Sequence, residues 1–149
     1  MTLEAIKDFL EKRNVKVSLK SGQRDPLESY LELFFETKEQ ESFLMEIGYI
    51  PDLEAEIDAF RLLQFVVPVL EISSKQPKHL DSIIHFMNSE LLTPGFVCDP
   101  QSGLVYFRYV MPLSKDESKV DLNQLTELLQ LLFFQIKNYA PRIQAAASE

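Results

Sequence analysis

Hydrophobic and polar residues follow two different periods along this chain, and each change of period marks an element. Three stretches carry apolar residues three and four positions apart, as one face of an α-helix does. They run from Thr2 to Arg13, from Lys78 to Leu92 and from Asp121 to about Tyr139. The remaining apolar stretches are short, rich in β-branched and aromatic residues, and bounded by turn residues, which predicts strands.

Three of the predicted strands precede the middle helix. They span Val15–Leu19, Tyr30–Glu36 and Phe43–Ile50. The connections between them are short and polar and leave no room for crossover helices, so we expect an antiparallel meander.

The stretch Phe60–Ile72 allows two interpretations. Its second half contains Val66, Val67 and Val69, which favours a strand. Pro68 cannot donate to a central ladder, so such a strand would lie at an edge or carry a bulge. A helix from Glu54 to Val66 is the alternative.

The last third of the chain predicts two strands and a helix. The strands are Phe96–Asp99 and Leu104–Leu113, and both faces of the second are largely apolar, which predicts a central strand or one covered on both sides. Asp121 is the expected N-cap of the final helix, which Pro141 should end or kink. We expect Ile143–Glu149 to be a frayed tail. One face of the longer strand would carry Leu104, Tyr106, Arg108 and Val110, and the other Val105, Phe107, Tyr109 and Met111.

These elements predict one α+β domain over residues 1–149. An antiparallel sheet of about five to six strands would be packed by three helices. A chain of 149 residues can bury roughly two-thirds of its unfolded surface, so it needs neither a metal nor a disulfide to fold.

Charge and cysteine content narrow the possible partners and the compartment. The net charge of −8 argues against nucleic acid, which requires a basic field. Cys98 is the only cysteine, so no intramolecular disulfide can form, as in a reducing compartment. The first residues lack the pattern of a signal peptide, and the longest apolar runs, such as Phe65–Leu70, are too short to span a membrane. We therefore expect a cytoplasmic protein without membrane insertion.

No pattern of catalytic, metal-binding or cofactor-binding residues is visible. The two histidines, His79 and His85, lie six residues apart on one predicted helix and so face different directions. Cys98 has no histidine in a motif near it, which favours a buried strand thiol over a nucleophile. The four glycines form no phosphate-binding loop. We expect no catalysis, no metal and no cofactor.

Several large residues fall outside the apolar faces of their elements. Phe86 lies off the face of the middle helix, and Leu131 and Phe134 lie off the face of the last one. Exposed apolar side chains of this size often mark an interface, unless the helices are buried on two sides. Arg108 and Tyr106 offer a second possibility, a recognition arginine stacked by tyrosines, although an arginine stem that covers apolar surface explains the same residues. The predicted outcome is a homodimer or a surface for a protein partner.

The order of elements, together with the phrase HFMNSELLTPGFVCDPQSGLVYFRYVMPL, resembles the YbjN family. That family is similar in fold to the type III secretion chaperones, the Tir-chaperone fold. The resemblance covers roughly Phe60–Ile143, and the first half of the chain only by element order. It implies a commonly dimeric α+β domain without catalysis, which in the chaperone branch binds an extended segment of a secreted protein along hydrophobic patches. The YbjN branch has been linked to regulation. The long, proline-containing Phe60–Ile72 segment departs from the chaperone branch.

Two hypotheses for function follow. The first is a chaperone-like or adaptor-like module that binds a peptide segment or protein partner through apolar patches. The second is a small-ligand-binding regulatory domain, or an enzyme with an irregular site, that uses the strand face of Arg108 and the tyrosines. A deep polar pocket holding Arg108 and a carboxylate would favour the second. A shallow apolar groove and a two-fold interface would favour the first.

Overall fold

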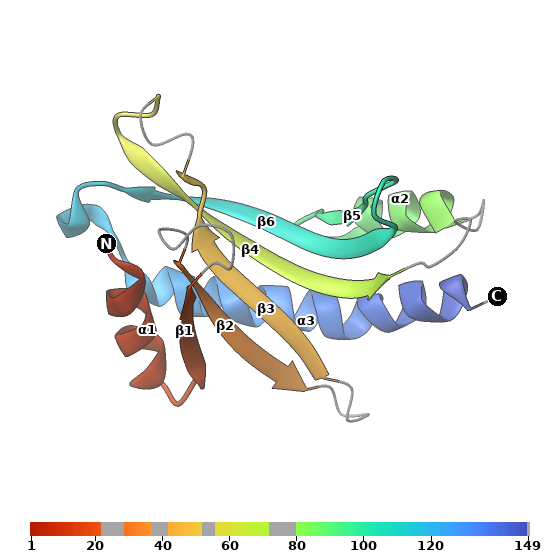
Figure 1. The fold of residues 1–149 in the computed structure, drawn as a ribbon, viewed down its shortest axis with the longest axis horizontal. Helices are drawn as coiled ribbons and strands as arrows, with labels where there is room; N and C mark the ends of the chain where they lie inside the picture. The colour runs from red at the N-terminus through yellow and green to blue at the C-terminus, as the bar shows by residue number, and fades with distance from the viewer. Residues whose placement is uncertain (22–28, 37–41, 52–55, 72–79, 149) are drawn as a thin grey trace.

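The computed structural model describes residues 1–21, 29–36, 42–51, 56–71 and 80–148. These residues form three α-helices, six strands and a short 3-10 helix (Figure 1). In chain order the elements are α1 (Leu3–Glu11), β1 (Val17–Ser21), β2 (Ser29–Glu36), β3 (Ser42–Tyr49), β4 (Phe60–Glu71), α2 (Leu80–Glu90), β5 (Phe96–Cys98), β6 (Leu104–Ser114), η2 (Glu117–Lys119) and α3 (Leu122–Ala147).

All six strands join one antiparallel sheet in the order β1-β2-β3-β4-β6-β5. The two longest strands, β4 and β6, pair from Phe60 opposite Ser114 to Glu71 opposite Leu104. The helix α3 runs along one face of the sheet, with α1 near its start and α2 near its end (Figure 1). The α+β class, the antiparallel sheet of five to six strands and the three helices are thereby confirmed.

The core lies between the sheet and the three helices. Alternate residues of each strand point toward the helices and are buried, as the period of two requires. Phe35 joins the layers, because its ring stacks on Phe43 of β3 and on Phe133 of α3. The most deeply buried side chains of the sheet are Leu31, Leu33, Met45, Ile47, Leu63, Phe65, Val67, Val105 and Phe107.

The strand interpretation of Phe60–Ile72 is confirmed for Phe60–Glu71, whereas the alternative helix is wrong for the residues that the structure describes. Pro68 explains two irregularities of β4. Val66 pairs with Glu46, but no β3–β4 pair is formed beyond it, because the backbone nitrogen of Pro68 faces β3 and has no hydrogen to donate. The pairing with β6 shifts between Pro68 and Leu70, and the Val69 carbonyl accepts a hydrogen bond from Gln144 Nε2 of α3 at 3.0 Å.

The predicted end of the last helix is wrong. The helix continues through Pro141 to Ala147, so residues 143–147 are helical rather than frayed. The proline removes one backbone hydrogen bond. The apolar face nevertheless continues beyond it, since Ala140 and Ile143 have no exposed surface. Burial of this last turn against the sheet outweighs the lost hydrogen bond.

The prediction for β6 is half right. Its residues alternate as expected, but only the face with Val105 and Phe107 is covered by helices. Arg108, on the other face, is exposed. β6 is central only where it pairs with the short β5, from Val105 to Phe107, and beyond that its outer edge has no partner strand among the described residues. Pro112 directs its hydrogen-free nitrogen to that edge, which blunts it against pairing with other chains.

Candidate functional site

The face of the sheet opposite the helices is the first candidate site. Its residues are half-buried or exposed, and the register places them on a common surface. We call this surface the open face. It includes Gly48, the apolar residues Phe34, Leu44, Val66, Pro68, Tyr106, Val97 and Val110, and the polar residues Glu32, Glu46, Gln64 and Arg108.

A row of charged residues crosses the middle of the open face. Glu32 lies directly opposite Glu46, Glu46 opposite Val66, and Val66 opposite Arg108. The half-burial of Glu46 and the neighbouring Glu32 carboxylate raise the pKa of Glu46. Like charges at directly paired positions destabilise a sheet. The open face therefore carries two acids that oppose each other and a base two strands away.

Arg108 is oriented by Gln64 rather than by tyrosine rings. Its Nε donates a hydrogen bond to Gln64 Oε1 at 2.6 Å. Tyr106 shares its face, but Tyr109 points to the core, where its ring lies 6.3 Å from that of Phe65. No aromatic ring stacks on the Arg108 guanidinium within the described part of the chain, so the tyrosine stacking that was one of the two interpretations of this residue is not formed.

A hollow of about 760 Å³ extends from the centre of the open face to the start of α1. Glu46, Gln64 and Arg108 line it on the sheet, and Thr2 lines it at the helix. It is an open depression rather than an enclosed pocket, although it brings an arginine and a carboxylate into one lining.

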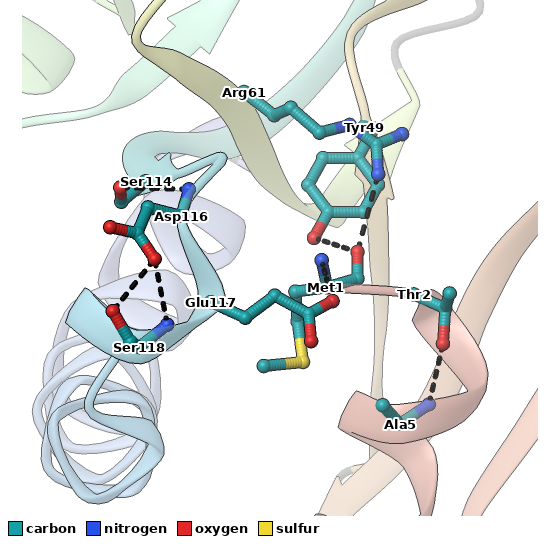
Figure 2. Close-up of polar contacts among 9 residues, drawn as sticks. All are labelled: Met1, Thr2, Ala5, Tyr49, Arg61, Ser114, Asp116, Glu117 and Ser118. Carbon is teal, nitrogen blue, oxygen red and sulfur yellow. Dashed lines mark hydrogen bonds and ion pairs between the residues drawn. The ribbon is translucent and has the colours of Figure 1, made fainter.

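The rim of this hollow is fixed by a group of polar contacts at Met1 (Figure 2). The Met1 carbonyl accepts hydrogen bonds from Tyr49 Oη at 2.9 Å and from Arg61 Nη1 at 3.2 Å, and its amino group lies 2.7 Å from the Glu117 carboxylate. The Arg61 guanidinium lies 3.6 Å from the centre of the Tyr49 ring. These contacts join the start of α1 to β3, β4 and η2. They give the hollow a defined wall where the sheet itself ends.

The second candidate site lies on the opposite side of the molecule, on the helices. The exposed fraction is 58% for Phe86, 79% for Leu92 and 62% for Phe134, and Leu131 is half-buried. We call these four residues the helix-side surface.

Gln135, which is 2% exposed, fixes this region. Its Oε1 accepts hydrogen bonds from the backbone nitrogens of Leu92 at 2.9 Å and Thr93 at 3.1 Å, and its Nε2 donates to the Thr93 hydroxyl. The segment after α2 is thereby held against α3.

The five residues predicted to form an interface therefore fall on two surfaces. Phe86, Leu131 and Phe134 belong to the helix-side surface, whereas Tyr106 and Arg108 belong to the open face. Leu92, Phe34 and the Glu32–Glu46 pair were not predicted as site residues from the sequence. Phe34 carried a usable signal, since alternation along β2 places it on the same face as Glu32 and Glu36.

Groups that could perform chemistry are scattered in the described residues. No set of three histidine, cysteine or acidic side chains is arranged to hold a metal there. His85 is exposed, and His79 lies outside the described ranges. The pKa of the half-buried Cys98 thiol is raised by burial and by Asp81 and Asp99. That shift keeps the thiol protonated and weakly nucleophilic.

Comparison with models of protein families and with curated proteins finds no match for this chain. Among the described helices, none is both long and apolar enough to cross a membrane.

Proposed function

We propose that this protein is a non-enzymatic protein-binding module, chaperone-like or adaptor-like, that acts as a homodimer. The observation that carries the proposal is the presence of exposed apolar residues on two surfaces, the open face and the helix-side surface, on opposite sides of the molecule. The resemblance to the YbjN family and to the type III secretion chaperone fold points the same way. Two surfaces allow one to hold a second copy while the other holds a partner.

The helix-side surface is suited to a protein partner. Three of its side chains are more than half exposed, which leaves large apolar areas in contact with water. Gln135 fixes the backbone beside Leu92, so the surface is ordered before a partner arrives, and less entropy is lost on binding. The net charge of −8 favours partners that are basic or neutral. A segment that presents apolar side chains, with basic residues around them, fits these properties.

Affinity capture from the native cell, followed by mass spectrometry, tests the proposal. The bait is the full chain, compared with a Leu92→Ser/Phe134→Ser variant. Phe34→Ser is the matched control, since Phe34 is 64% exposed and Phe134 is 62% exposed. We expect a protein that the wild-type and Phe34→Ser chains retain and the double variant loses. Its affinity for each purified bait then provides the quantitative measurement. Recovery of no protein that depends on Leu92 and Phe134 would contradict the proposal.

A second candidate function rests on the hollow. Arg108 and Glu46 present opposite charges in one depression of about 760 Å³, which suits a small zwitterion such as an amino acid or dipeptide. Thermal-shift measurements with amino acids and dipeptides test it. A ligand of this site would raise the melting temperature of the wild-type protein but not that of an Arg108→Ala variant. No shift with any of them would remove this candidate.

A further inference from the structure

The strands on the two sides of β4 have matching directions, as if they were related by a two-fold axis along β4. Strands β3 and β6 lie on either side of β4, and both are antiparallel to it. They therefore run in the same direction as each other. One strand further out, β2 and β5 also share a direction, because each is antiparallel to its inner neighbour. A rotation of 180° about an axis along β4 therefore places β3 on the position of β6 and β2 on the position of β5, with each pair of strands running in the same direction.

The residues at corresponding positions are complementary. Glu46 and Arg108 both pair directly with Val66, so an acid on one side of β4 corresponds to a base on the other. Gly48 and Val110 both pair with Gln64, which sets a small residue against a larger one. Two further correspondences join apolar residues, namely Leu44 with Tyr106 and Phe34 with Val97.

We propose that the open face is the homodimer interface and packs against the same face of a second copy about a two-fold axis along β4. This inference rests on the dimer in the proposed function and assigns its surface. Sheets that pack face to face lie about 10 Å apart with nearly aligned strands. In that arrangement Glu46 of each copy lies opposite Arg108 of the other, and Val66 faces Val66 at the axis. A two-fold interface repeats each contact, so each dimer contains two such ion pairs.

The charges of the open face support this occupant over an unrelated partner. Within one copy, the Glu32–Glu46 pair has no basic partner among the described residues, since the described ion pairs involve other groups. Half-burial and the neighbouring Glu32 carboxylate raise the pKa of Glu46. The Arg108 guanidinium donates to the neutral amide of Gln64, its only hydrogen-bond partner among the described residues. A second copy supplies the missing partner of Glu46 and that of Arg108 at once. It also leaves the helix-side surface of both copies facing outward, so one dimer could bind two partner segments.

Charge reversal tests the interface by sedimentation velocity. Arg108→Glu places acids opposite Glu46, and Glu46→Arg places bases opposite Arg108. Either variant alone should raise the dimer dissociation constant by at least about a hundredfold, because like charges then face each other twice. An equimolar mixture of the two variants should form heterodimers, since both contacts then join opposite charges. The double variant, Glu46→Arg/Arg108→Glu, should dimerise by itself for the same reason.

Controls keep the test decisive. Circular dichroism establishes that each variant is folded, and if a reversal prevents folding, Glu46→Gln and Arg108→Gln replace it, with an expected weakening of about tenfold. Leu92→Ser/Phe134→Ser should leave the dimer unchanged.

A wild-type monomer at 100 µM, or single reversals with the wild-type dissociation constant, would overturn the inference. So would a mixture of reversals that stays monomeric. The capture experiment has a different readout, so the partner-binding function can survive the loss of this dimer.

Discussion

The two faces of the sheet are built from the same strands but differ in kind. Toward the helices, the fully buried positions are all apolar, and Phe65 and Phe107 have no exposed surface. On the open face, apolar residues surround Glu32, Glu46 and Arg108. Stability alone would have placed uncharged residues at the paired positions of Glu32 and Glu46. The comparison shows that successive side chains of one strand have different roles. Those that point toward the helices stabilise the core, and those on the open face are available to contact another molecule.

The largest effect is expected from truncation on the covered side. Phe107 is fully buried, with its ring centre 5.1 Å from that of Phe96. Phe107→Ala should lower the free energy of unfolding by about 3–5 kcal/mol, because it leaves a cavity between sheet and helices. Tyr106→Ala, on the adjacent position of the open face, should cost less than about 1 kcal/mol. Urea unfolding at one low protein concentration measures both. Equal losses would show that the open face contributes to the core as well.

A smaller loss of stability is expected from alanine substitution at two glycines, of which only Gly95 is packed tightly against another backbone segment. A Cβ on Gly95 would lie 2.2 Å from the Arg108 carbonyl oxygen, and Gly95 O already accepts a hydrogen bond from Arg108 N at 2.8 Å. Gly95→Ala must therefore separate two backbone segments and should cost about 1–3 kcal/mol. A Cβ on Gly48, on the open face, would meet Tyr30 Cβ at 3.4 Å, an ordinary contact. Thermal unfolding should show Gly48→Ala close to the wild type, and the reverse order would contradict the packing described for Gly95.

Gln135 is the polar exception among the buried residues described on the covered side. Gln135→Ala leaves the backbone nitrogens of Leu92 and Thr93 without their acceptor. Part of that loss is recovered from water, since Leu92 is exposed, so we expect a cost of roughly 1–2 kcal/mol. Asn138→Ala, on the exposed side of the same helix, is the control and should change little. Hydrogen exchange of the Leu92 and Thr93 amides provides a local readout, and unchanged protection of both would contradict the role assigned to Gln135.

The fold was predictable because the period of the apolar residues is local information. The helices, the strands and even the irregular β4 follow from residues close in sequence, with Pro68 indicating its own bulge. Helix α3 was predicted too short, because the effect of Pro141 is local while the burial of Ile143 depends on the sheet. The candidate site was less accessible. The opposition of Glu32 and Glu46, and the correspondence of Glu46 with Arg108 across β4, can be recognised only once strand order and register are known. Exposure of Phe86 and Phe134 could be predicted from helical spacing, whereas their separation from Arg108 could not.

The smallest effect concerns Glu46 and tests whether the open face sacrifices stability for recognition. Because burial and Glu32 raise the pKa of Glu46, the folded monomer binds this proton more tightly than the unfolded chain does. Protonation of Glu46 therefore contributes to the free energy of unfolding at low pH. This contribution is lost as the pH rises through the folded-state pKa of Glu46. Glu46→Gln should therefore stabilise the monomer at pH 7, by only about 0.2–0.5 kcal/mol because the group is half exposed and screened by solvent.

That gain should disappear at pH 3, where the raised pKa keeps Glu46 protonated in the wild type. Urea unfolding at the two pH values, at concentrations below dimerisation, measures it, with Glu36→Gln as the control opposite the uncharged Ser42. The same Glu46→Gln substitution should weaken the dimer, because Arg108 of the second copy loses its partner. A more stable monomer and a weaker dimer in one variant would mark Glu46 as a recognition residue. A less stable monomer at pH 7 would instead show that Glu46 already has a stabilising partner within its own chain.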